Sequence, residues 1–205
     1  MRAIVDRIET TLPHGWRDFW LQFLVFWTFN LSYEATRGLS DGARAAAFKN
    51  GMRRLASGVC VVTTKLTNGP VGLLSTSVTS VSADPPVLLF CVNKSTSSHD
   101  AFLSSKSFCV NVLEEADQVV ATRFGSPDFR HVRFEDRDWQ KLATGSPALK
   151  GCSVSFDCEV ISQIAVSTHT IFLGHVLDIA QWTESCSPLL YWDGEYHPVA
   201  NERRG

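Results

Sequence analysis

The residues best suited to chemistry lie in the stretch Val71–His99. Six of the eight residues in Ser75–Ser82 carry a hydroxyl group. A Pro-Pro pair and the unbroken apolar run Val87–Val92 follow, and then Asn93–His99 places a lysine among small hydroxyl groups. Hydroxyl groups beside a buried strand need polar atoms to face, and a phosphate-bearing ligand supplies such atoms. The alternative is that these serines and threonines only cap turns and solvate the edge of a strand.

Two further features have both a functional and a structural explanation: the serine at the start of a helix within this stretch, and Arg123 beyond it. Ser97 or Ser98 lies at the start of a short helix predicted over Asp100–Ser105, where free N–H groups suit an anion but an ordinary serine N-cap is also expected. Arg123 lies near the end of a helix predicted over Glu114–Phe124, where a cation is favourable in any case. Neither residue identifies a site on its own.

Composition limits the classes of protein that this chain can belong to. Its 205 residues, 44% of them apolar, suffice for one domain with a real core. A formal net charge of -2 does not suggest nucleic-acid binding. The six cysteines include no C-x-x-C motif, so neither a disulfide framework nor a metal site is expected. We therefore expect a reducing, cytoplasmic environment.

Residues 1–41 form an extension that does not match the rest of the chain. The aromatic and apolar run Phe19–Trp27 is too short and too interrupted by polar residues to predict a membrane span, and it does not resemble a signal peptide. Three interpretations remain open: a helix packed on the domain or on a partner subunit, a helix at a membrane interface, or a translated extension without order. Residues 42–200 are predicted to form the main domain, with 201–205 as a tail.

Hydrophobic patterning predicts mostly strands within the main domain. Ser40-Asp41 is an N-cap pattern for an amphipathic helix over Ala43–Ser57, with Gly58 as its stop. Residues 125–150 are predicted to be loop-like. Strands are predicted over Val59–Thr64, the stretch after Thr67–Pro70, Val87–Val92, Phe108–Leu113, Cys152–Val160 and Thr170–Leu177, and a hairpin over Leu189–His197.

Two of these strand patterns are especially clear. In Cys152–Val160, apolar and polar residues alternate strictly, which predicts one buried and one exposed face. Asp193-Gly194, flanked by Leu189–Trp192 and Glu195–His197, predicts a tight hairpin turn. Strands do not alternate with long helices, and neither a Rossmann nor a P-loop motif occurs. An antiparallel barrel with a few peripheral helices is therefore expected.

From about Phe48 to Val199 the chain resembles the flavin reductase family. The resemblance rests on an ordered series of segments: F-x(3)-M-x-R-L-A-S-G-V, V-G-L-L-S-T-S-V-T-S-V-S-A-D-P-P-V-L-L-F-C-V, V-N-V-L, R-F, S-P-A-L-K-G, S-F-D-C-E-V, H-T-I-F-L-G-H-V and P-L-L-Y-W-D-G-E-Y. The series covers three quarters of the chain. It implies an FMN-binding split β-barrel, mainly β in class, and a homodimer with flavin near the subunit interface.

The resemblance also implies which residues bind the cofactors. On the flavin side they are Pro70, Val71, Gly72, Leu73, Leu74, Thr76, Ser77, Cys91, Val92, Asn93, Lys94, Ser97, Ser98, Arg123 and Phe124. On the nicotinamide side they are His169, Tyr191, Trp192, Asp193 and Gly194. The family has Gly-Asp-His where this chain has Ser167-Thr168-His169, so the histidine is kept and the two residues before it differ. His169 is the candidate catalytic residue, either orienting the nicotinamide carboxamide or screening developing charge.

The function implied is NAD(P)H-dependent reduction of free or loosely bound FMN or FAD, with transfer of reduced flavin to a separate monooxygenase. NADH is favoured over NADPH because no arginine cluster suited to a 2′-phosphate stands out. Two other functions stay open. One is an FMN-binding electron-transfer or storage protein without a nicotinamide site, and the other is a flavin-dependent reductase of another acceptor.

Overall fold

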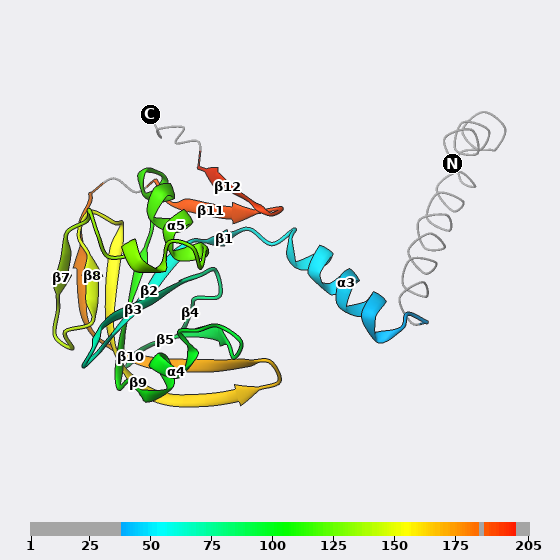
Figure 1. Ribbon diagram of the computed structural model, residues 1–205, viewed down its shortest axis with the longest axis horizontal. Helices are drawn as coiled ribbons and strands as arrows, with labels where there is room; N and C mark the ends of the chain where they lie inside the picture. The colour runs from blue at the N-terminus through cyan, green and yellow to red at the C-terminus, as the bar shows by residue number, and fades with distance from the viewer. Residues whose placement is uncertain (1–37, 185–186, 200–205) are drawn as a thin grey trace, which may run out of the picture. The chain divides into compact units, whose positions relative to one another are not determined.

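The computed structural model describes residues 38–184 and 187–199 and divides the chain into two units, Met1–Met52 and Arg53–Gly205 (Figure 1). In the first unit the described element is helix α3, Asp41–Met52. The Ser40 hydroxyl accepts a hydrogen bond from the Ala43 amide (3.4 Å), which confirms the predicted N-cap. The predictions for residues 1–37, Cys186 and the tail 201–205 lie outside the described residues, and the predicted domain boundary at residue 41 stays a prediction.

Helix α3 ends earlier than its sequence pattern predicts. It stops at Met52, not Ser57, and Gly58 belongs to strand β1, Ser57–Gly58. Beyond the helix the chain pairs with a distant strand, because Ser57 lies opposite Tyr191 and the Asp193 amide donates to the Arg53 carbonyl (2.9 Å). This long-range pairing overrides the local helical pattern of residues 53–57.

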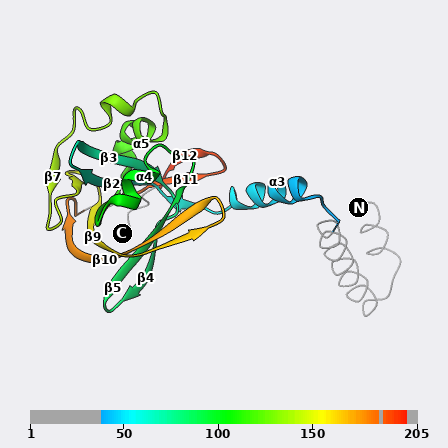
Figure 2. The ribbon, with the colours of Figure 1, turned by 60° about the horizontal axis from the view of Figure 1, so that its bottom comes forward.

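Seven antiparallel strands form the main sheet of the second unit, in the order β3-β2-β6-β9-β10-β5-β4. In the turned view of Figure 2, β9 and β10 run together as a long hairpin beside β5 and β4. The first and last strands of this order, β3 and β4, are not paired with each other, so the sheet is open between them, as in the split β-barrel that the resemblance implies. The strands are β2 Cys60–Leu66, β3 Gly69–Ser75, β4 Thr79–Ala83, β5 Pro86–Asn93, β6 Ser107–Val112, β9 Val154–Val166 and β10 His169–Gln181.

Phenylalanine rings from three strands and one helix form the centre of the main core. Phe90 of β5 lies 4.7 Å from Phe108, 5.1 Å from Phe172 and 5.4 Å from Phe102, measured between ring centroids. Phe102 belongs to helix α4, His99–Ser104, which the sequence predicts one residue later. All four rings are almost fully buried. The apolar run Val87–Val92 is thus the buried strand that its pattern predicts.

A second apolar cluster covers the other face of β2. Cys60 and Val62 belong to the main core, while Val59 and Val61 belong to this second cluster together with Phe124 and Leu189. The remaining described elements are short: 3-10 helix η1 Glu115–Asp117, α5 Gln118–Gly125, 3-10 helix η2 Arg130–Val132, β7 Trp139–Lys141, β8 Pro147–Leu149, β11 Leu189–Trp192 and β12 Glu195–Pro198. Among them, helix α5, strand β8 and strand β11 contribute buried residues to the second cluster.

Strand β9 is buried on both faces in its first half, so the predicted exposed polar face is wrong. Ser155 and Asp157 are fully buried, as is Cys158. Ser155 donates to the Asn111 side chain (2.8 Å), and the Thr144 amide and hydroxyl both donate to the Asp157 carboxylate (2.6 Å). The segment predicted to be a loop contains the hairpin β7–β8, and this segment covers the polar face.

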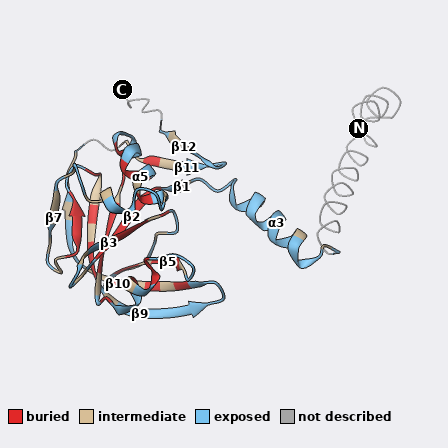
Figure 3. Ribbon diagram, viewed as in Figure 1, coloured by how far each residue is buried: buried red, intermediate tan, exposed pale blue. Residues whose placement is uncertain are grey.

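The predicted hairpin over Leu189–His197 forms, and the strands predicted over Cys152–Val160 and Thr170–Leu177 form a second hairpin, β9–β10. Asp193 (φ 50°) and Gly194 (φ 94°) both have positive φ, as expected for a tight hairpin turn. The connection between β9 and β10 is shorter than predicted, because β9 continues to Val166 and only Ser167 and Thr168 form the turn. Figure 3 shows that the far half of β9 is exposed along this extension.

Four of the five described cysteines behave as buried apolar groups, and Cys91 is half-buried. Cys60, Cys109, Cys152 and Cys158 are buried free thiols, and burial raises the pKa of Cys60 and Cys158 to about 12 and that of Cys152 to about 11. Such thiols stay protonated and are poor nucleophiles. Across residues 38–184 and 187–199 no helix is long and apolar enough to cross a membrane, and no cluster of metal-binding side chains occurs.

Candidate functional site

Two arginines and a run of hydroxyl groups line one cavity of about 400 Å³, here called the arginine cavity. The hydroxyl groups come from the loop between β5 and α4, and the arginines follow α5 in the chain. Apolar side chains of β3 and the end of α5 complete the lining. The lining residues are Leu73, Leu74, Ser95, Thr96, Ser97, Ser98, Phe124, Gly125, Pro127, Arg130 and Arg133.

Arg133 is held rigidly by backbone carbonyl groups. Its guanidinium donates to the carbonyls of Gly72 (3.0 Å), Arg123 (3.2 Å) and Ser126 (3.0 Å). These bonds join strand β3 to the end of α5, and they use three of the five guanidinium N–H groups. Two N–H groups therefore remain for another acceptor.

Arg130 and Arg133 form a local excess of positive charge. Burial lowers the pKa of Arg133, and the nearby charge of Arg130 lowers that pKa further. Among the described residues, neither arginine has a carboxylate within ion-pair distance. Two like charges without a counter-ion, beside four hydroxyl groups, make a site suited to a multiply charged anion such as a phosphate.

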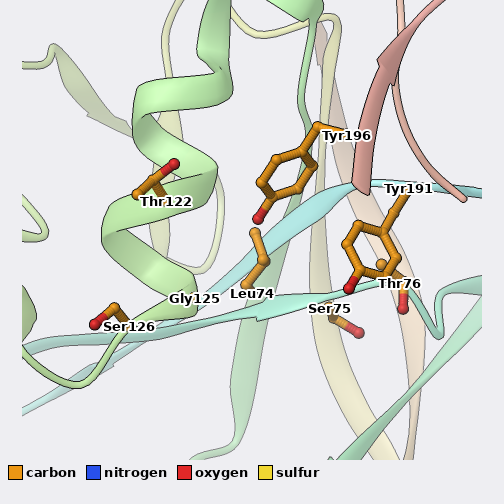
Figure 4. Close-up of a pocket in the computed structure, with 8 residues that line it drawn as sticks. All are labelled: Leu74, Ser75, Thr76, Thr122, Gly125, Ser126, Tyr191 and Tyr196. Atoms are coloured by element: carbon orange, nitrogen blue, oxygen red, sulfur yellow. The ribbon is translucent and has the colours of Figure 1, made fainter. Parts of the chain in front are cut away.

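A second cavity of about 410 Å³, here called the tyrosine cavity, adjoins the first. The two share Leu74 and Gly125. Figure 4 shows the Tyr196 hydroxyl directed toward Leu74, and Tyr191 lying beside Thr76. Partial burial and the neighbouring Tyr191 raise the pKa of Tyr196. The lining residues are Leu74, Ser75, Thr76, Thr122, Gly125, Ser126, Tyr191 and Tyr196.

The absence of a side chain at Gly125 keeps the boundary between the cavities narrow. A Cβ atom there would lie 3.3 Å from Leu74 Cδ2 and 3.7 Å from the Tyr196 hydroxyl. Gly72 permits a similar close approach, since its Cβ would lie 2.6 Å from a ring atom of Phe124. These glycines let α5 pack directly on β3 beside both cavities.

Strand β3 carries part of the predicted flavin set into these cavities. Leu73 and Leu74 of β3, and Thr76 directly after it, line the cavities, and Gly72 permits the close approach of the Phe124 ring. Pro70 does not join this group. It lines a third cavity of about 390 Å³ at the other end of β3, together with Lys65, Gly69, Phe134, Trp139, Gln140, Lys141, Gly145 and Pro147. Val71 lines none of the three cavities.

The other residues of the predicted flavin set divide into those that line the arginine cavity and those that do not. Ser97 and Ser98 line the arginine cavity. Ser77 instead bonds to the backbone of Cys91, accepting from its amide at 3.2 Å. Asn93 accepts from both the amide and the hydroxyl of Ser95 (3.0 Å each) and so shapes the loop. Val92 is buried in the main core and lines none of the three cavities.

Two cationic side chains that are predicted to bind flavin, those of Arg123 and Lys94, form contacts outside the cavities. The Arg123 guanidinium donates to the Glu135 carbonyl (3.1 Å) and pairs with the Asp136 carboxylate (3.4 Å). The Lys94 ammonium donates to the Ser167 carbonyl (2.7 Å). Neither side chain lines the arginine cavity.

The predicted nicotinamide residues lie on two hairpins. His169 is exposed at the start of β10, and its Nδ1 lies 2.9 Å from the Thr168 hydroxyl. Tyr191 lines the tyrosine cavity, while Trp192, Asp193 and Gly194 extend to the exposed tip of the β11–β12 hairpin.

The charged residues of the arginine cavity are not among the site residues predicted from the sequence. Arg130 and Arg133 lie in the segment predicted to be a loop, where no periodic pattern indicates a shared face. The folded chain brings these two arginines to one cavity, a pairing that the sequence pattern does not indicate. The spacing of two arginines three residues apart, just after the R-F segment, was the available indication.

Comparison with known proteins gives a consistent result. A family model described as "Flavin reductase like domain" matches residues 52–200. An FMN reductase (NADH), RutF, from Pantoea ananatis is 37% identical over 155 residues, covering 76% of this chain and 81% of that protein.

Two solved structures are similar along nearly their whole length. Nitrilotriacetate monooxygenase component B from Mycobacterium thermoresistibile has a TM-score of 0.73 and 32% identity, covering 81% of this chain and 92% of its own. The NADH:FAD oxidoreductase of Streptomyces globisporus has a TM-score of 0.73 and 28% identity, covering 80% and 98%.

Proposed function

Because the chain belongs to the flavin reductase family, we propose that it uses NADH to reduce FMN and passes the reduced flavin to a separate flavin-dependent monooxygenase. The choice of FMN is supported by a relative named for FMN at 37% identity, against 28% for the structure named for FAD. The name of another similar structure, a monooxygenase component, supports the partner.

The observation that carries this proposal is the pairing of a cationic cavity with an aromatic one across Leu74 and Gly125. FMN has a dianionic phosphate at one end and a flat ring at the other. Arg130, Arg133 and the hydroxyl groups of residues 95–98 fit the phosphate. The flat ring fits the tyrosine cavity of about 410 Å³, which shares Leu74 and Gly125 with the arginine cavity.

The chain's own residues bind and orient rather than transfer protons. FMN, when bound, supplies the acceptor for a hydride from NADH. Arg133 anchors β3 and the end of α5, so that both cavities keep their relative position. Tyr191 closes one side of the tyrosine cavity and would limit access of water to the stacked rings. Several residues predicted from the sequence line the two cavities and support this placement of FMN: Leu73, Leu74, Thr76, Ser97, Ser98, Phe124 and Tyr191.

Anaerobic stopped-flow absorbance tests the proposal directly. With FMN in excess over protein, NADH is expected to bleach flavin absorbance over many turnovers, and FMN to exchange freely from the protein. A tightly bound flavin that stays oxidised with both NADH and NADPH would contradict the reductase and favour an electron-transfer or storage protein.

We propose that His169 faces the nicotinamide. It is exposed, and the Thr168 hydroxyl engages its Nδ1, which leaves Nε2 directed away from that contact. His169→Ala is expected to lower either the NADH affinity or the hydride-transfer rate by about tenfold, the size of one charge-assisted or well-placed hydrogen bond. Single-turnover kinetics over a range of NADH concentrations separates the two. A change within about twofold in both quantities would remove His169 from the site.

We also propose a homodimer and a cytoplasmic location. Exposed apolar side chains on the β9–β10 hairpin, Ile161, Ile164, Val166, Leu177 and Ile179, support burial against a second copy. The free cysteines of the described chain support a reducing compartment. Sedimentation equilibrium and cell fractionation test these two statements.

A further inference from the structure

The turn that carries His169 contains a residue in an unfavourable backbone conformation. Ser167 has φ 46°, in the left-handed region that costs any residue with a Cβ atom more than it costs glycine. The turn has only two residues, Ser167 and Thr168, between Val166 of β9 and His169 of β10. Ser167 and Thr168 are exposed, so packing in the core does not force this conformation.

Lys94 contacts this turn twice from a different part of the chain. Its amide donates to the Thr168 carbonyl (2.9 Å), and its ammonium donates to the Ser167 carbonyl (2.7 Å). The first bond extends the pairing of β5 with β10 by one step beyond Asn93 and His169. The second bond holds the carbonyl of the left-handed residue, Ser167, toward the Lys94 ammonium.

From this geometry we propose that Lys94 is a positioning residue for His169. Its ammonium stabilises the left-handed conformation of Ser167, and that conformation sets where β10 begins and where the His169 ring projects. The proposal rests on the proposed function only in assigning His169 to the nicotinamide. It replaces the prediction that Lys94 binds the flavin phosphate, because its ammonium is engaged at Ser167 and does not line the arginine cavity.

Hydrogen bonds of Thr168 and Thr170 connect the turn to His169 and to His99. The Thr168 hydroxyl lies 2.9 Å from His169 Nδ1, so a turn that moves would take this contact with it. One residue further on, the Thr170 hydroxyl lies 2.9 Å from Nε2 of the buried His99. His99 begins α4, directly after the hydroxyl groups of the arginine cavity. The start of β10 is thus fixed on the His99 side, and Lys94 fixes the turn itself.

Two substitutions distinguish positioning of His169 by Lys94 from a direct effect of the lysine charge on the bound dinucleotide. Lys94→Met keeps the length of the side chain but removes its donor, and Ser167→Gly removes the cost of the left-handed conformation. Lys94→Met alone is expected to raise the KM for NADH about fivefold, with the Kd for FMN within about twofold of wild type. Adding Ser167→Gly is expected to bring the KM for NADH back to within about twofold of wild type. Lys106→Met, at an exposed lysine outside all three cavities, is the matched control and is expected to change neither constant.

Hydrogen exchange measures the same effect without any cofactor. In Lys94→Met, amide exchange in the segment 166–169 is expected to become about fivefold faster, and the added Ser167→Gly is expected to reverse much of this change. The control Lys106→Met is expected to leave exchange in this segment unchanged.

Each contrary outcome has a distinct meaning. A raised Kd for FMN in Lys94→Met would show that Lys94 binds the flavin phosphate. A raised KM for NADH that Ser167→Gly does not restore would show that the lysine charge acts directly on the dinucleotide. Unchanged kinetics and unchanged exchange would remove Lys94 from any role in the turn. If the wild-type protein does not oxidise NADH, the proposed function fails, and exchange in the segment 166–169 still decides whether Lys94 holds the turn.

Discussion

Replacing Arg130 by alanine is expected to raise the Kd for FMN about tenfold to a hundredfold, the range for losing a hydrogen bond to a charged group. Arg130 lines the arginine cavity, and among the described residues it has no carboxylate within ion-pair distance. Its side chain is exposed, so the free energy of unfolding is expected to change by less than about 0.5 kcal/mol. Titration of flavin fluorescence with protein measures the Kd.

Riboflavin, which lacks the phosphate, is the comparison that makes this result specific. Its Kd is expected to be equal for wild type and Arg130→Ala. Arg54→Ala, at an exposed arginine outside all three cavities, is the control for a general loss of positive charge and is expected to bind FMN like wild type. A variant that binds FMN normally but loses activity with NADPH would instead assign Arg130 to the 2′-phosphate of the nicotinamide cofactor.

Phe90→Ala is expected to lower the free energy of unfolding by about 3–5 kcal/mol, the range for removing a large aromatic side chain from a core. Phe90 is fully buried, and its ring lies within 5.4 Å of three other phenylalanine rings. Rings from β6, β10 and α4 cannot all move to fill the space, because each belongs to a different element. Urea unfolding followed by fluorescence gives the value.

The matched control for this prediction is Phe129→Ala. Phe129 is 42% exposed, so the same change of side chain is expected to cost less than about 0.5 kcal/mol. Equal losses in the two variants would mean that the four-ring cluster does not dominate the stability of the barrel.

Much of the fold could be predicted because neighbouring residues in the sequence are enough to indicate many of its strands and turns. The apolar run Val87–Val92 is bounded by turn residues, so its length and composition indicate a buried strand without knowledge of its neighbours. Asp193-Gly194 indicates a hairpin because aspartate and glycine tolerate the positive φ that such a turn requires. The resemblance to flavin reductases rests on the order of such segments, and the split barrel confirms the fold that it implies.

The predictions of secondary structure and burial are wrong where contacts between distant segments override the local sequence pattern. Residues 53–57 continue a helical pattern, but pairing of Ser57 with Tyr191 takes the chain into a sheet. Ser155 and Asp157 have the polar character of an exposed face. They are buried because Asn111 and Thr144 supply hydrogen bonds that offset the loss of water.

The candidate site also contains some residues that local sequence pattern predicts and others that only long-range folding brings together. The hydroxyl groups of residues 95–98 could be predicted because they directly follow a buried strand. Arg130 and Arg133 could not, since an irregular segment has no period from which a shared face can be deduced. Lys94 could be identified as a cation from the sequence, but its partner lies 73 residues away along the chain, at Ser167. The sequence by itself therefore determined the family, the barrel and the hydroxyl-rich segment that lines the arginine cavity. Tertiary structure alone decided which cations face that cavity and which are used to hold the backbone, because a charge acts on whatever long-range folding brings within a few ångströms of it.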